Sequence, residues 1–135
     1  MLNHHLIPGQ FLTRRDIAAM FGGNTRTYLP QTGGRIVAGC FDPKMNPRVP
    51  HEILVGTGRL AHAAARRLME QEGAVPIFIR RAPARWEYAG EFKAVAYSDH
   101  TGELEARIYE VVPRVYEAYR KTYGDVAGIL FLEAV

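Results

Sequence analysis

Glycine and proline divide this chain into short segments, and this division restricts its possible folds more than any other feature. Runs suited to strands and runs with helical spacing follow one another irregularly, without repeated βαβ units. The strand-like runs cover residues 36–41, 51–56, 77–80, 86–97 and 126–135. The order predicts an α+β domain, with a curved, mostly antiparallel sheet and helices packed on it.

Two segments carry clear helix signals. Thr13 is a typical N-cap for a short helix that ends at Gly22-Gly23. Residues 59–72 form the strongest helical pattern. Its predicted apolar face comprises Leu60, Ala61, Ala64, Ala65, Leu68 and Met69, and its predicted polar face comprises Arg59, His62, Arg66, Arg67 and Glu70. Residues 113–124 predict a third helix, whereas 104–112 fit a strand or a helix.

The length of 135 residues fits one domain, predicted to span residues 1–135. No run approaches the roughly 18 apolar residues of a membrane span, and the start lacks the pattern of a secretory signal. A single cysteine, Cys40, excludes an internal disulfide, and nothing around it indicates a metal cluster. We expect a cytoplasmic protein with no metal, no cofactor and no membrane partner.

Positive charge gathers in the first two thirds of the chain. Residues 1–93 contain 13 Lys and Arg against 7 Asp and Glu, whereas residues 94–135 contain 4 against 7. Arginine supplies 14 of the 17 basic residues. Its planar fork suits phosphate and stacks on bases. A GC-rich genome is an equal explanation for this composition, so the positions of the arginines matter more than their number.

The stretch "PIFIRRAPARWEYAGEF" at 76–92 predicts a hairpin whose loop carries Arg80, Arg81 and Arg85. Three guanidinium groups there would neutralise backbone phosphates. The alternative is a solvated loop that keeps its charges for solubility. Trp86 and Tyr88 are two residues apart and so project to one face of the sheet. They would stack on bases or, alternatively, fill the core.

The turn "GTGR" at 56–59 precedes the long helix. Its amides and Arg59 would face a phosphate, and His62 and Arg66 lie one helical turn apart on the same side. A plain tight turn followed by a solvated helix face is the alternative.

The loops "NTRTYLPQ" and "FDPKMNPRVP" are the best candidates for a base pocket, because recognition residues concentrate on loops held by a rigid scaffold. Tyr28 and Phe41 would sandwich a flipped base. Asn46 and Asp42 would hydrogen-bond its edge. Turn chemistry is the alternative for Asn46 and Asp42.

Catalysis finds little support in the sequence. Glu87 and Glu91 would be roughly 13 Å apart in an extended strand, too far for a glycosidase pair. Cys40 lies in an apolar run, where it behaves as a small hydrophobe. We expect a protein that binds and does not catalyse.

The collinear succession "TRRDIAAMFGGN", "RIVAGCF", "ILVGTGR", "VPIFIRR" and "WEYAGEF" resembles the SRA-like DNA-reading domain of HNH-type modification-dependent restriction endonucleases. The resemblance covers residues 11–97. The matching positions are Arg14, Arg15, Ile17, Phe21, Gly22, Gly23, Phe41, Gly56, Gly58, Phe78, Tyr88, Gly90, Glu91 and Phe92. The turn "GTGRLAH" departs from the family in lacking its Glu and its following Gly-Asp, and the sequence carries no HNH segment.

The resemblance implies a pseudo-barrel of the PUA-like superfamily that binds nucleic acid and accommodates a modified or flipped base in a concave aromatic pocket. The implied partner is modified double-stranded DNA, with a nuclease as a fused or separate effector. Two alternatives stay open. One is an RNA or single-strand reader of the YTH or EVE kind. The other is a protein-interaction module that uses the acidic, tyrosine-rich C-terminal segment with Tyr109, Tyr116, Tyr119 and Tyr123.

Overall fold

A computed structural model of the chain describes residues 5–99, 117, 120–121 and 125–135. The elements, in chain order, are β1 (Phe11–Leu12), α1 (Arg14–Phe21), β2 (Gln31–Thr32), β3 (Arg35–Ile36), β4 (Gly39–Phe41), β5 (Glu52–Gly56), α2 (Arg59–Glu70), β6 (Val75–Ala82), β7 (Arg85–Ser98) and β8 (Val126–Ala134). The four C-terminal tyrosines lie outside the described residues, as does all of the predicted third helix except residues 117, 120 and 121.

The described strands form a six-stranded sheet and a separate β2–β3 ribbon. The main path of the sheet runs β4-β6-β7-β8-β5, with β1 added beside β7, and its pairs are antiparallel except for β4 with β6. The prediction of an α+β domain with a mostly antiparallel sheet is therefore confirmed. The predicted strand at 36–41 is instead divided into β3 and β4, which belong to different sheets.

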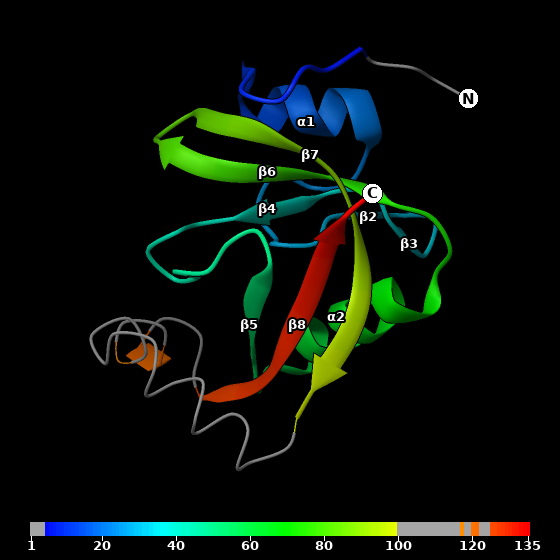
Figure 1. Cartoon of the computed structure of the whole chain (residues 1–135), viewed down its shortest axis with the longest axis vertical. Coiled ribbons are helices and arrows are strands. Elements are labelled where there is room, and N and C mark those ends of the chain that lie inside the picture. The colour runs from blue at the N-terminus through cyan, green and yellow to red at the C-terminus, as the bar shows by residue number, and fades with distance from the viewer. Residues whose placement is uncertain (1–4, 100–116, 118–119, 122–124) are drawn as a thin grey trace.

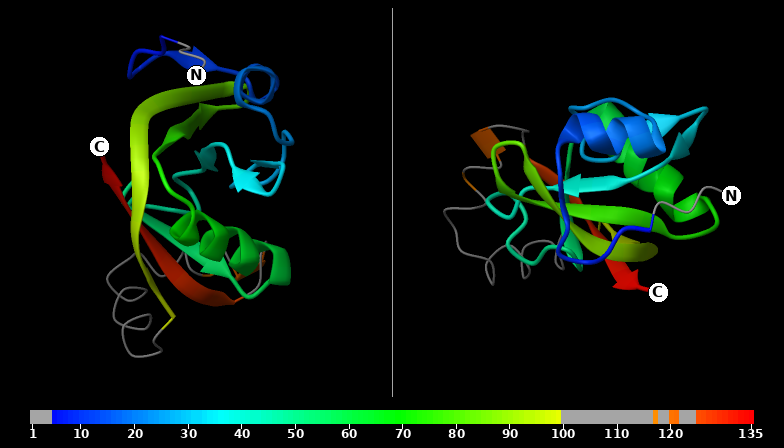
Figure 2. Two further views of the ribbon diagram at one scale, coloured as in Figure 1. Left: turned by 90° about the vertical axis from the view of Figure 1, so that its right-hand side faces the viewer. Right: turned by 90° about the horizontal axis from the view of Figure 1, so that it is seen from above.

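Strand β7 organises the sheet because it pairs with β6 along its first half and with β8 along its second. It bends strongly, so that the sheet curls and leaves α1, the β2–β3 ribbon and α2 on its open side (Figure 2). Gly90 has a φ of +119°, which L side chains rarely adopt, while an added Cβ would meet only the Phe92 ring at 3.9 Å. Glycine is thus needed here for the backbone conformation and not for a close approach.

Helix α2 packs its buried side chains, Ala64, Ala65 and Leu68, into the larger apolar cluster between the helix and the sheet (Figure 1). Leu60 does not follow the prediction, since it is 84% exposed. The reason is that Leu60 borders the cavity described below and does not contact the sheet.

Helix α1 packs on the β6–β7 hairpin and closes a second apolar cluster (Figure 1). Ile17 is its buried anchor and packs with Phe78 and Tyr88. The predicted N-cap is confirmed: Thr13 accepts from the amide of Asp16, and the Asp16 carboxylate accepts from the amide of Thr13. This capping box fixes where the helix begins.

No helix in the described part of the chain is long and apolar enough to cross a membrane. The same residues contain no group of three or more His, Cys, Asp or Glu side chains suited to a metal ion.

Candidate functional site

A cavity of about 840 Å³ opens between the loop at 24–29, the first turns of α2, and the strands β4 and β6–β7. Its wall is largely apolar. The apolar contributors include Leu29, Cys40, Met45, Leu54, Ala61 and Ala64. This volume lies within the range of small-ligand pockets, roughly 300–1,000 Å³. The segments that meet here are far apart in the sequence, and the bent sheet brings them together.

Tyr28 forms part of the cavity wall and is half-buried. Its hydroxyl donates to the carbonyl of Ala61, which ties the 24–29 loop to α2. Its ring lies against Phe41, with centroids 6.4 Å apart. Phe41 itself is 1% exposed, belongs to the large apolar cluster and does not line the cavity. The predicted sandwich of a base between Tyr28 and Phe41 is thus not formed: Tyr28 faces the cavity and Phe41 supports it from behind.

Trp86 also lines the cavity, half-buried, and packs against the cluster under α1. Tyr88 packs in that same cluster, as expected for residues two apart, but it is buried and does not reach the cavity. Burial and a hydrogen bond from its hydroxyl to the Glu91 carboxylate (2.7 Å) raise the pKa of Tyr88. Tyr88 is therefore a core residue, as the alternative to stacking foresaw.

Asp42 and Asn46 line the cavity, but their polar atoms mostly serve the local backbone. Asp42 accepts from the amide of Lys44 through one oxygen (2.9 Å) and contacts Arg80 through the other (3.4 Å). The buried Asn46 accepts from the amide of Leu54 (2.9 Å) and donates to the carbonyl of Asp42 (3.3 Å). Turn chemistry, the alternative stated above, accounts for the bonds to Lys44 and Asp42. The bond to Leu54 instead ties the loop to β5.

Arg14 is a cavity residue that sequence reasoning missed, apart from its place in the family resemblance. It occupies the first position of α1, and its guanidinium lies 5.2 Å from the centroid of the Trp86 ring. One terminal nitrogen donates to the carbonyls of Thr27 (2.9 Å) and Asn24 (3.3 Å). Arg14 therefore joins α1, the 24–29 loop and Trp86 on one side of the cavity. No local sequence signal distinguishes it from the adjacent Arg15.

Four arginines line the cavity, namely Arg14, Arg26, Arg67 and Arg80, whereas Asp42 is the single carboxylate in the described lining. Arg67 donates to the carbonyl of Gly34. A carbonyl holds a guanidinium in place without cancelling its charge, so the mouth of the cavity is electropositive.

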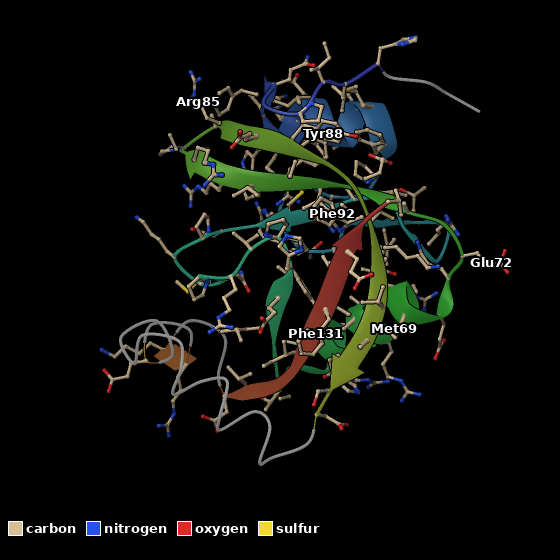
Figure 3. The ribbon with its side chains drawn as sticks, viewed as in Figure 1. Met69, Glu72, Arg85, Tyr88, Phe92 and Phe131 are labelled. Carbon is tan, nitrogen blue, oxygen red and sulfur yellow. The ribbon has the colours of Figure 1, made fainter. Side chains whose placement is uncertain are left out.

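The structure separates the three hairpin arginines. Strands β6 and β7 extend to Ala82 and Arg85, so the turn is only Pro83–Ala84 and the arginines lie on the strands. The prediction of an arginine-bearing loop is therefore wrong. Arg80 lies at the cavity, whereas Arg81 pairs with Glu87 (2.6 Å). Arg85 lies over the Phe11 ring (4.1 Å) and stands out from the hairpin end in Figure 3. Because strand side chains alternate, Arg85 and Glu87 lie on the opposite face from Trp86.

The predicted polar face of α2 is also divided. Arg59 is exposed in the first turn, and Arg66 is exposed with a loose ion pair to Glu70 (3.9 Å), but neither lines the cavity. His62 was predicted to contact a phosphate together with Arg66, with a solvated helix face as the alternative, and the structure places it on neither. It faces the sheet, with Nδ1 3.1 Å from the Tyr97 hydroxyl, because α2 lies against β7 there.

Cys40 contributes an inert surface to the cavity. Burial raises the pKa of its thiol to about 12, and the nearby charge of Arg14 opposes that rise only in part. The thiol is therefore protonated at neutral pH and behaves as an apolar side chain.

Comparisons with known proteins bear on the fold and on the family. No curated protein matches the chain by sequence. Among solved structures, the fold is similar to that of the SRA domain of SUVH5, solved in complex with hemi-methylated CG DNA. The TM-score is 0.60 at 9% identity, and the match covers 100% of this chain and 91% of that one. The SRA-like fold expected from the sequence is thereby confirmed. Residues 11–118 match the family described as Domain of unknown function (DUF6697), and the chain belongs to that family.

Proposed function

We propose that this protein is a reader of modified double-stranded DNA that accommodates a modified or flipped base in the cavity. The observation that carries the proposal is the cavity itself, since an aromatic wall and four arginines meet at one opening on an SRA-like scaffold. The structural neighbour was solved with hemi-methylated CG DNA, which supports DNA as the ligand class.

Binding would begin at the mouth of the cavity. Arg26, Arg67 and Arg80 would contact backbone phosphates, and such contacts supply most of the affinity that is independent of sequence. The amides in the first turn of α2 would add to this contact, because in the described part of the chain Gly58 provides no side-chain cap and the turn contains no acidic residue. Arg59 would extend this contact along the duplex.

The base would be held inside the cavity, between its aromatic and its aliphatic side chains. Taking a base out of the duplex costs a few kcal/mol, least for a damaged or mismatched base. Stacking of that base on an aromatic side chain contributes about 1–3 kcal/mol and so offsets part of this cost. Trp86 and Tyr28 supply the rings, while Cys40, Leu29 and Leu54 supply an apolar surface that fits an added alkyl group. Asn46 keeps one amide hydrogen for the base edge, since the structure assigns its other groups to the backbone.

The proposed role is binding without catalysis. The resemblance to the reading domains of HNH-type endonucleases supports a nuclease as the effector, contributed by another domain or another chain.

Fluorescence anisotropy with labelled oligonucleotides tests the proposal. The panel contains unmodified duplex, duplexes with 5-methylcytosine, 5-hydroxymethylcytosine, glucosylated 5-hydroxymethylcytosine or N6-methyladenine, and single-stranded RNA with and without N6-methyladenosine. We expect one modified duplex to bind at least tenfold more tightly than the unmodified one, with affinity that falls steeply with salt.

Tighter binding to modified single-stranded RNA than to any duplex would favour a reader of the YTH or EVE kind. Binding to no nucleic acid, or binding without salt dependence, would contradict the proposal and favour a protein-interaction module.

A further inference from the structure

The first turn of α2 holds a large apolar side chain in solvent at the lip of the cavity. Leu60 is 84% exposed, and the residues that follow it on the apolar face, Ala64, Ala65 and Leu68, are buried. Among the described residues, the other exposed large hydrophobic side chains are Ile7, Phe11, Val95 and Val135, and none of them lines the cavity. Leu60 is therefore exposed where the proposed ligand would enter.

Leu60 is also unlike its neighbours around the mouth. The other exposed residues that line the cavity are polar, charged or small: Asn24, Thr25, Arg26, Thr27, Gln31, Gly58, Ala63, Arg67 and Arg80. Among the described residues that line the cavity, Leu60 is thus the single large apolar side chain that is exposed.

A base that swings out of a duplex turns about its own backbone, so the gap it leaves faces the mouth of the pocket that receives it. Proteins that unstack bases commonly insert an apolar side chain such as Leu between base steps. We infer that Leu60 is the side chain that enters the duplex and fills this gap. The inference rests on the proposed function and assigns a specific residue to holding the duplex open.

The backbone of Leu60 is well suited to this role because it is held rigidly. The amide of His62 donates to the carbonyl of Gly58 (3.0 Å), which closes the first turn around Leu60. The adjacent Ala61 accepts from the hydroxyl of Tyr28, and so the turn is fixed to the 24–29 loop. A turn whose backbone is already fixed loses little backbone entropy when its side chain inserts.

The test uses the modified duplexes of the panel above, each with 2-aminopurine beside the modified base, because this fluorophore brightens when its neighbour leaves the stack. Wild type is compared with Leu60→Ala, Leu60→Phe and the matched surface control Ile7→Ala, which removes a 70% exposed side chain away from the cavity. Thermal melting checks that each variant is folded.

For Leu60→Ala we expect about a tenfold loss of affinity for the preferred modified duplex and loss of most of the fluorescence rise. Affinity for unmodified duplex should stay within about twofold, since the phosphate contacts are unchanged. Affinity for the same modified single strand should also be unchanged, because a single strand leaves no gap to fill. Leu60→Phe and Ile7→Ala should behave like wild type.

If Leu60→Ala keeps both the preference and the fluorescence rise of wild type, the inference is overturned and the proposed function stands. An equal loss on duplex and single strand would also overturn it, since Leu60 would then contact the base itself. Should wild type raise the fluorescence of none of the modified duplexes, the flipped-base proposal and the inference would fail together.

Discussion

The arginines at the cavity and those near the end of the hairpin are held in different ways. Arg14 and Arg67 donate to backbone carbonyls, which carry no net charge. Arg81, in contrast, is paired with the Glu87 carboxylate, and Arg85 lies over the ring of Phe11. Arg80 belongs to both sets, since it lines the cavity and contacts Asp42.

The difference shows that a cluster of arginines in sequence is a poor guide to the available positive charge. A guanidinium held by carbonyls is positioned and keeps its charge for an incoming phosphate, whereas one paired with a carboxylate must first exchange that partner. The hairpin sequence "RRAPAR" is the densest basic segment of the chain, yet the arginines with the most usable charge come from α1, α2 and the 24–29 loop.

The largest effect is expected on the aromatic wall. Trp86→Ala should weaken binding to the preferred modified duplex by about 5- to 150-fold, because stacking contributes about 1–3 kcal/mol per base. Anisotropy measures the affinity, and thermal melting shows whether the variant is folded. The matched control is Phe11→Ala, which removes a 44% exposed ring near Arg85. Equal losses in the two variants would contradict the division between the cavity and the hairpin end.

The next effect separates the two sets of arginines directly. The double variant Arg26→Gln/Arg67→Gln should weaken binding to every duplex and reduce the slope of log K against log salt by about 2, since each phosphate contact contributes about 0.9. The control pair Arg81→Gln/Arg85→Gln removes the same charge from the hairpin end and should change the slope by less. If the hairpin pair has the larger effect, the phosphate footprint lies on the hairpin.

A smaller effect is expected from the ion pair on the hairpin. Glu87→Gln should change the free energy of unfolding by only about 0–1 kcal/mol, because both partners are partly exposed. If Arg81 lies outside the footprint, the affinity for DNA should remain unchanged in anisotropy. A clear gain in affinity would instead show that Glu87 masks a phosphate contact.

The smallest effect concerns the first turn of α1, the helix that begins at Arg14. Hydrogen bonds from the backbone and side chain of Thr13 lower the pKa of Asp16 below its ordinary value. The ionised carboxylate therefore stabilises the folded state above its unfolded pKa, near 3.9, and this contribution is lost as the pH falls through the lower folded pKa. Denaturation between pH 6 and 3 should show this loss in wild type and not in Asp16→Asn. The same pH dependence in both would exclude Asp16 as its source.

Local patterns in the sequence predict most of the fold. The N-cap at Thr13, the glycines after the first helix and the apolar spacing of residues 59–72 led to helices where α1 and α2 lie. The hairpin and the closing strand follow from runs of β-forming residues between turn signals. These features are predictable because each depends on interactions among residues only a few positions apart.

The candidate site was only partly predictable. Tyr28, Asp42, Asn46 and Trp86 line the cavity as expected, whereas Phe41 and Tyr88 lie in the core. Arg80 also lines the cavity, although it was predicted on a phosphate-binding loop. A strand buried on both faces gives no signal of which aromatic ring meets the cavity and which meets another layer. Arg14 and Leu60 were missed because their roles depend on segments distant in the chain.

The sequence by itself determined where α1 begins, that a helix follows Gly58, and that Trp86 and Tyr88 share a face, because capping, glycine conformation and strand alternation act over a few residues. Only the tertiary structure decided which charges are neutralised, which rings are buried and where an exposed leucine borders a cavity. These depend on how strongly β7 bends and on where it brings α1, α2 and the 24–29 loop together. Long-range packing sets that arrangement, and no local pattern encodes it.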